Sequence, residues 1–238
     1  MAGGHYVALS GMRTRLDELD RLANDIANVG TAGYKAERTG QRVALRPVFD
    51  DALETAIDAS TGGRRLDARA GAIASTGRNL DVAIEGRGFL AVDTPQGVRY
   101  TRNGHLNRAE DGALMTADGA VVRGVDGPIA VGTGALEVGD DGTVYSDGVS
   151  VGKLAIVEFT NPSALVRESG SLLRGDETPT PVALPTVRPG SLEQANISVV
   201  DRIAELTNVN RSFQALQKAV SVLMNDVDGR AIDSLGRR

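Results

Sequence analysis

Several features that mark particular kinds of site or protein are absent from this chain of 238 residues. Cysteine is absent, which excludes disulfides, thiolate catalysis and thiolate metal sites. The net charge of −5 argues against nucleic acid or an anionic membrane as a partner. No apolar run approaches the roughly 18 residues of a membrane-spanning helix, so we expect no membrane insertion. Residues 1–15 lack a basic segment followed by an apolar one, so no cleavable secretion signal is expected.

Residues 5–29 have the pattern of an amphipathic helix. Apolar residues recur after three or four positions, which is the spacing of a coiled-coil seam. Gly30 and Gly33 are expected to end this helix, because glycine tolerates the positive φ of many helix ends. The remaining faces carry charged residues, namely Arg13, Arg15, Asp17, Glu18, Asp20 and Arg21. The apolar seam consists of Leu9, Met12, Leu16, Leu19, Ala23 and Ile26.

A second seam runs through residues 191–228. Its mean spacing is about 3.5 residues, with one irregular step between Leu206 and Val209. Ser191 and Ser198 are candidate N-caps, and Asp228-Gly229 is the expected end of the helix. The seam consists of Val199, Ile203, Leu206, Val209, Phe213, Leu216, Val220, Leu223 and Val227.

Between these segments the pattern favours β-structure. The stretches "NLDVAIEGRGFLAVD" and "KLAIVEFT" are rich in strand-forming residues. Residues 175–190 hold several prolines and indicate an extended connector, whereas residues 58–72 look like a loop. Six dipeptides are typical of hairpin turns, and these are Asn103-Gly104, Asp111-Gly112, Asp118-Gly119, Asp126-Gly127, Asp141-Gly142 and Asp147-Gly148.

The sequence therefore predicts an α+β fold. The N- and C-terminal helices would form a coiled-coil layer, and a central all-β domain would consist of hairpins. The expected parts are 1–35 for the N-terminal helix and its turn, 36–190 for the β domain with its connectors, and 191–238 for the C-terminal helix and tail. Because two helices alone bury little surface, we expect both seams to pack against neighbouring molecules. A self-contained monomer is the alternative.

Motifs that would suggest catalysis or ligand binding have simpler interpretations. "GVSVG" around Ser150 matches a nucleophile elbow, but that motif needs a strand before it and a helix after it. "GRGFLA" from Gly86 to Ala91 is followed by a strand-like stretch, whereas a dinucleotide site needs a helix there. The Asp-Gly pairs lack calcium-loop spacing, and His5 and His105 have no partner cluster. We therefore expect no enzyme activity, no cofactor and no metal site.

Three segments resemble the family of flagellar axial proteins, which includes rod, hook and hook-associated proteins. "LANDIANVGTAGYKAER" is similar to the N-terminal signature A-N-N-[LI]-A-N-x-x-T-x-G-[FY]-K, with Asp25 in place of the usual second Asn. Residues 79–124 are similar to the central rod and hook segment, through Gly86, Gly88, Phe89 and "YTRNGHL". Residues 192–220 resemble the C-terminal helix, although Asn210, Ala215 and Gln217 depart from the usual pattern. The length and single β domain resemble a proximal-rod protein most, with the distal-rod type second.

The resemblance implies a structural role. The terminal helices would form the inner layer of a hollow helical rod in the flagellar basal body, spanning the periplasm and transmitting torque from motor to hook. The implied partners are itself, other rod subunits, the flagellar type III export apparatus and the surrounding basal-body rings. The alternatives are a distal-rod or hook-type subunit, a secreted serine hydrolase using Ser150 or a wall-binding β module. The expected assembly interface consists of Leu9, Met12, Leu16, Leu19, Ile26, Asn28, Gly33, Tyr34, Val199, Ile203, Leu206, Phe213, Leu216, Val220 and Leu223.

Overall fold

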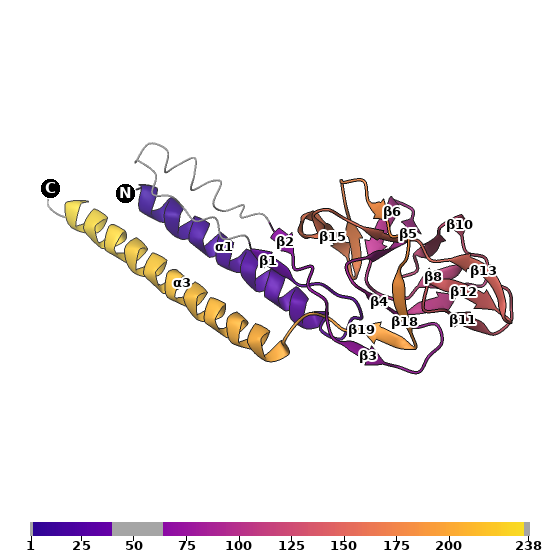
Figure 1. The fold of residues 1–238 in the computed structure, drawn as a ribbon. Coiled ribbons are helices and arrows are strands. Elements are labelled where there is room, and N and C mark those ends of the chain that lie inside the picture. Colours follow the sequence, from indigo (N-terminus) through magenta and orange to yellow (C-terminus); the bar gives the residue numbers. More distant parts are fainter. Residues whose placement is uncertain (1, 40–63, 236–238) are drawn as a thin grey trace. The chain divides into compact units, whose positions relative to one another are not determined.

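The computed structural model describes residues 2–39 and 64–235 of the chain, and side chains within 9–38 and 64–222 (Figure 1). The fold is α+β, with a long helix near each end and strands between them. The chain divides into two compact units. The described part of the helical unit contains residues 2–26, 39 and 198–235, and the β unit contains residues 27–38 and 64–197.

The N-terminal helix α1 spans Ala2–Ala27. A short turn follows it, in which the amide of Thr31 donates to the carbonyl of Asn28 at 3.0 Å. Gly33 has φ of +68°, whereas Gly30 does not have a positive φ. A Cβ atom at residue 33 would also overlap the backbone of Arg102. The sequence therefore predicted the helix end, but only Gly33 has the left-handed conformation that requires glycine.

The C-terminal helix α3 spans Val199–Leu235. Ser198 precedes it, and its Oγ accepts a hydrogen bond from the amide of Asp201 at 3.4 Å. Ser191 is not an N-cap, because it begins a strand. The predicted end at Asp228-Gly229 is also wrong, since the helix continues for another turn and more. A single glycine inside a helix costs only about 1 kcal/mol relative to alanine, which does not force an end.

The described residues of the β unit form one large sheet and several smaller ones. The large sheet has the strand order β15-β16-β6-β5-β9-β8-β7, with β10 added at β9, β14 at β5 and β17 at β14. These strands are β5 Phe89–Thr94, β6 Gly97–Thr101, β7 Leu106–Arg108, β8 Leu114–Thr116, β9 Val121–Gly124, β10 Gly127–Pro128, β14 Ile156–Glu158, β15 Val166–Ser169, β16 Leu172–Arg174 and β17 Thr180–Pro181. A 3-10 turn, Pro162–Ala164, precedes β15.

The smaller sheets join distant parts of the chain. One has the order β11-β12-β13, and the pairs β18-β4, β19-β3 and β1-β2 complete the set. The Pro-rich connector is extended, as predicted, and its last part returns as β18 and β19 to strands that lie about a hundred residues earlier. Part of the predicted loop at 58–72 is instead strand β2, and residues 58–63 lie outside the described residues. The bounds are β1 Glu37–Thr39, β2 Arg64–Leu66, β3 Ile73–Ser75, β4 Val82–Glu85, β11 Leu136–Val138, β12 Thr143–Ser146, β13 Val149–Lys153, β18 Thr186–Pro189 and β19 Ser191–Glu193.

Five of the six predicted hairpin turns join consecutive antiparallel strands, and the glycine has a positive φ in each. The exception is Asn103-Gly104. Asn103 is buried, and a Cβ at Gly104 would overlap the carbonyl oxygen of Val82. This dipeptide therefore marks a close crossing of two backbones and not a hairpin. Glycine in β-structure often stands where another backbone approaches closely.

Apolar residues of the β unit form two clusters. The larger one includes Leu90, Val92, Leu106 and Val122, all fully buried. In the smaller one the rings of Phe89 and Phe159 meet edge to face with centroids 6.0 Å apart, and Tyr100 packs on Phe159 at 4.7 Å. Burying one such side chain stabilises a fold by about 1.5–3 kcal/mol, so these clusters give the β unit its own core.

Candidate assembly interface

The seam of α1 remains largely accessible within the chain. Leu9 and Leu16 are 58% and 46% exposed. Met12, Leu19 and Ile26 are half-buried. Leu22, which lies outside the predicted seam, is fully buried instead. The helix therefore presents apolar surface beyond what the described part of the chain covers.

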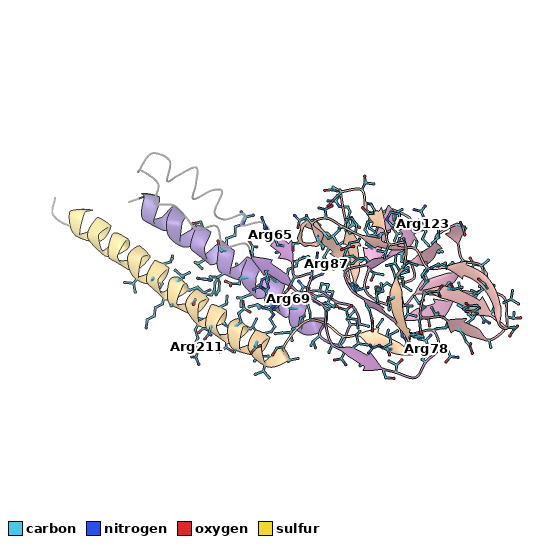
Figure 2. All side chains as sticks on the ribbon, in the orientation of Figure 1. Arg65, Arg69, Arg78, Arg87, Arg123 and Arg211 are labelled. Atoms are coloured by element: carbon cyan, nitrogen blue, oxygen red, sulfur yellow. The ribbon has the colours of Figure 1, made fainter. Side chains whose placement is uncertain are left out.

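The seam of α3 divides into two parts. At its start Val199 and Ile203 are exposed, the latter by 50%. From Leu206 onward the seam is shielded: Val209 is buried, and Phe213, Leu216 and Val220 are half-buried. The side chain of Leu223 lies outside the described residues. Outside the seam, Val200 is 77% and Val222 58% exposed, and Arg211 also projects into solvent (Figure 2).

The shielded parts of the two helices contact each other in antiparallel fashion. A Cβ at Gly11 would lie 3.8 Å from Cδ1 of Leu216, and Arg21 forms an ion pair with Glu205. Residues later in α1 thus meet residues earlier in α3. This contact covers one face of each helix, which leaves Leu16 and Ile203 open.

The turn after α1 is held by contacts inside the β unit. Tyr34 is 1% exposed, and the guanidinium of Arg167 stacks 4.1 Å from its ring centroid. The same arginine donates to the hydroxyl of Tyr34 at 2.6 Å and to the carbonyl of Lys35. At the start of the turn, Asn28 Oδ1 accepts from the hydroxyl of Thr31 at 3.2 Å. The sequence placed Asn28, Gly33 and Tyr34 in the interface, and the structure shows what each contacts within its own chain.

A buried ionic cluster lies behind this turn. Glu193 accepts from the ammonium of Lys35, from Arg102 Nη1 at 3.1 Å and from the amide of Gly71 at 2.8 Å. Burial lowers the pKa of Lys35, an effect that the neighbouring Glu193 carboxylate opposes without cancelling it. Burial also lowers the pKa of Arg102, against the opposing charge of Glu193. The cluster was not found in the sequence analysis, because its members lie far apart along the chain.

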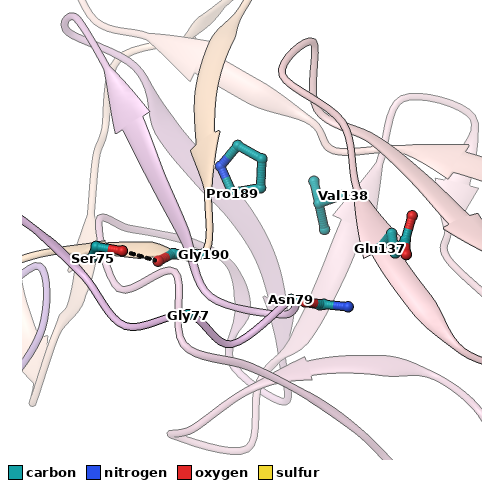
Figure 3. A pocket seen from close by; sticks show the side chains of 7 residues that line it. All are labelled: Ser75, Gly77, Asn79, Glu137, Val138, Pro189 and Gly190. Atoms are coloured by element: carbon teal, nitrogen blue, oxygen red, sulfur yellow. Dashed lines mark hydrogen bonds between the residues drawn. The ribbon is translucent and has the colours of Figure 1, made fainter.

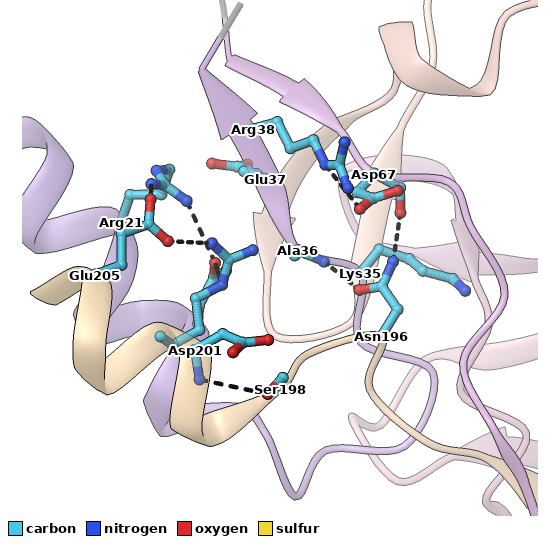
Figure 4. Close-up of polar contacts among 12 residues, drawn as sticks. Arg21, Lys35, Ala36, Glu37, Arg38, Asp67, Asn196, Ser198, Asp201 and Glu205 are labelled. Carbon is cyan, nitrogen blue, oxygen red and sulfur yellow. Dashed lines mark hydrogen bonds and ion pairs between the residues drawn. The ribbon is translucent and has the colours of Figure 1, made fainter.

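Asn196 completes the attachment of the turn (Figure 4). Its side-chain oxygen accepts from the amide of Ala36 at 2.8 Å. Its amide nitrogen donates to the carbonyls of Asp67 at 2.7 Å and Arg69 at 3.1 Å. One side chain between β19 and α3 therefore joins Ala36, in the segment after α1, to Asp67 and Arg69, in the segment after β2.

The motifs considered for catalysis lie in plain β-structure. Ser150 is exposed on β13 opposite Tyr145, and Gly86 and Gly88 precede strand β5. A hollow of about 430 Å³ lies elsewhere on the β unit, where Ser75 Oγ donates to the carbonyl of Gly190 at 3.3 Å (Figure 3). Its lining has one ionisable side chain, Glu137.

Two negative observations concern the described part of the chain. Within residues 2–39 and 64–235, no group of three or more His, Cys, Asp or Glu side chains could hold a metal ion. In the same ranges neither helix is long and apolar enough to cross a membrane.

Comparison with known proteins identifies the family. The model of the flagellar hook protein FlgE/F/G D1 domain matches residues 83–146, which run from β4 to β12. The flagellar basal-body rod protein FlgF of Rhizobium meliloti (strain 1021) is 33% identical over 246 residues, covering 99% of both chains. The chain belongs to the flagellar basal-body rod protein family. This is a family of structural proteins and not of enzymes.

Two further relatives show the breadth of the rod family. FlgF of Caulobacter vibrioides (strain ATCC 19089 / CIP 103742 / CB 15) is 31% identical over 98% of this chain and 97% of its own. FlgG of Bacillus subtilis (strain 168) is 30% identical over 91% of this chain and 93% of its own.

The three segments that resemble the rod family meet at one place in this structure. Gly33 and Lys35 come from the first segment, Arg102 from the second, and Glu193 and Asn196 from the third. The amide of Gly33 donates to the carbonyl of Glu193 at 2.7 Å. This junction thus joins the two segments by which the chain enters and leaves the β unit.

Proposed function

We propose that the protein is a structural subunit of the bacterial flagellar rod that polymerises through its terminal helices into a hollow helical axle. In the basal body this axle transmits torque from motor to hook. The observation that carries the proposal is the uncovered apolar surface on both helices of a rod-family protein, with Leu16 46% and Ile203 50% exposed. Exposed apolar patches of this kind mark protein interfaces. A heterologous contact that does not close into a ring produces a filament.

The helices would form a coiled-coil layer with those of neighbouring subunits. The seam spacing near 3.5 residues supports this packing, because it keeps one stripe facing the partner. The assigned interface is the set of fifteen residues named above, from Leu9 to Leu223. Leu9, Leu16, Val199 and Ile203 are its most accessible members.

Among rod proteins we favour the proximal, FlgF type. Two relatives that carry that name are 33% and 31% identical over 99% and 98% of the chain. The FlgG type is the alternative, since a FlgG is 30% identical over 91% of the chain. The partners would be its own copies, other rod subunits and the basal-body rings in the periplasm. Export would use the flagellar type III apparatus.

The experiment introduces a charge on the exposed seam. Ile203→Asp should leave the isolated protein folded, since the side chain is already half in water. It should prevent incorporation into basal bodies and abolish swimming, because a buried charge without a partner costs several kcal/mol at each contact. Gln214→Asp adds the same charge at an exposed polar position of α3 and serves as the matched control.

The readouts are circular dichroism of the purified variant, its presence in purified basal bodies and swimming of a strain that carries it as the sole copy. Normal incorporation of Ile203→Asp would contradict an interface on this seam. If neither variant is incorporated into basal bodies, α3 tolerates no added charge, and the result does not locate the interface at Ile203.

A further inference from the structure

Four charged side chains link the end of α1 to the start of α3. Arg21 and Asp25 come from α1 and are 6% and 0% exposed. Arg202 and Glu205 come from α3 and are 18% and 37% exposed. This charged quartet lies within the helical unit (Figure 4).

Every contact in the charged quartet joins opposite charges. Within each helix, Arg21 Nη1 lies 3.5 Å from Asp25 Oδ2, and Arg202 Nη1 lies 2.6 Å from Glu205 Oε2. Between the helices, Arg21 Nη2 lies 3.0 Å from Glu205 Oε1, and Arg202 Nε lies 3.3 Å from Asp25 Oδ2. The arrangement is a closed ring of two cations and two anions, and its two cross-helix pairs depend on the register.

The apolar seams alone do not determine that register. A seam that repeats every seven residues has nearly the same shape after one helix slides by one heptad, about 10 Å at 1.5 Å per residue. Leu, Val and Ile side chains then meet similar side chains. Apolar packing alone therefore does not select one of these registers.

The charged quartet discriminates between them. If α3 shifted by seven residues in one direction, Asp25 would face Val209 in place of Arg202. A shift in the other direction would place Asp25 opposite residue 195, which precedes the first residue of α3 at Val199. In that second register Arg202 would face Glu18 and could still form an ion pair. Asp25, which is fully buried, would lose its cross-helix cation Arg202 in both cases and keep Arg21 of its own helix. Removing one partner of a buried charge is unfavourable.

We propose that the charged quartet fixes the register of α1 against α3 within the subunit, with Asp25 as its specificity-determining residue. This role does not depend on polymerisation, because all four residues belong to one chain. The quartet selects one register, while the apolar contacts supply most of the stability. Buried polar groups are known to set register in paired helices at some cost in stability.

The test measures the register directly in the full-length protein. Because the chain has no cysteine, spin labels at Arg13→Cys and Gln214→Cys report a single distance across the helix pair by pulsed electron paramagnetic resonance. The singly labelled proteins give the intermolecular background. The expected result for the otherwise native chain is one narrow distance distribution.

Two variants separate register from stability. The first replaces the charged quartet by apolar residues of similar size (Arg21→Met, Asp25→Leu, Arg202→Met, Glu205→Leu). It should keep its helix content by circular dichroism but show added distances that correspond to a slide of about 10 Å. The second, Asp25→Asn, keeps the shape of the side chain and should broaden the distribution. Asp20→Asn, at an exposed position of the same helix, should leave it unchanged.

Three results would overturn the proposal. One is a broad distribution in the native chain, and another is a single unchanged distance in the apolar variant. If the apolar variant loses its helices, Asp25→Asn decides, and a distribution identical to that of Asp20→Asn would show that packing alone sets the register.

Discussion

Lys35 and Glu193 are 158 positions apart in the chain and form an ion pair in which each side chain is only 1% exposed. Arg102 contacts the other carboxylate oxygen of Glu193, so one buried anion faces two buried cations. Arg102 also lies 5.2 Å from the ring centroid of Phe89 and donates to the carbonyls of Ile84 and Gly86. The carboxylate of Glu193 is therefore the central group of the junction.

Replacing Glu193 by Gln should strongly destabilise the β unit. The amide keeps the size of the side chain but leaves Lys35 and Arg102 without a buried counter-charge, which typically costs about 3–5 kcal/mol. Urea denaturation followed by circular dichroism measures the free energy of unfolding. The matched control is Glu85→Gln, whose partner Arg188 is 58% exposed, and an exposed pair of this kind contributes about 0–1 kcal/mol. Equal effects of the two changes would contradict the account of the junction.

Gly33→Ala should destabilise the protein far more than Gly30→Ala. At residue 33 the backbone has φ of +68°, which costs a residue with a Cβ about 1–2 kcal/mol, and the added methyl would overlap the backbone of Arg102. At residue 30 nothing lies within 4 Å of the added atom. Thermal unfolding of both variants checks the prediction. Similar melting temperatures for the two would mean that the turn does not pack as described.

The stability of the β unit should depend on Asp67 in acid. Burial raises the pKa of Asp67, but hydrogen bonds from Arg69 and the charge of Arg38 outweigh this effect, so its pKa lies below the usual 3.8. A lowered pKa in the folded state stabilises the protein above about pH 4, and this contribution is lost as the pH falls through the folded value. Asp67→Asn should therefore be less stable than the native protein near pH 6, with a difference that shrinks toward pH 2. Parallel stability curves over that range would contradict the prediction.

Local patterns in the sequence predicted the local structure well. The two helices follow from apolar spacing, and five hairpins follow from Asp-Gly pairs whose glycines have positive φ. The failures arise where distant parts of the chain decide. Asn103-Gly104 has the pattern of a hairpin turn, but its backbone passes close to the carbonyl oxygen of Val82. Ser191 has the pattern of a helix N-cap, but it pairs with Ser75 in a sheet.

The candidate site shows the same division. The seam residues Leu16 and Ile203 were predicted from spacing alone. Arg21 was assigned to a face outside the apolar seam, and charge patterning cannot show that Glu205 pairs with it from 184 positions away. Asp25 in place of the usual Asn was a signal that this turn of α1 has a charged neighbour. The role of Glu193 had no local signal, since it follows from strand pairing between β19 and β3.

The central claim is that the helices of this protein build the inner layer of the rod. An electron cryomicroscopy map of purified basal bodies tests it most directly, with the subunit located by its β unit. We predict continuous α1 and α3 density around the axial channel, with Leu16 and Ile203 of each subunit buried against helices of its neighbours. A map in which these two side chains face solvent, and the subunits contact each other only through their β units, would contradict the account.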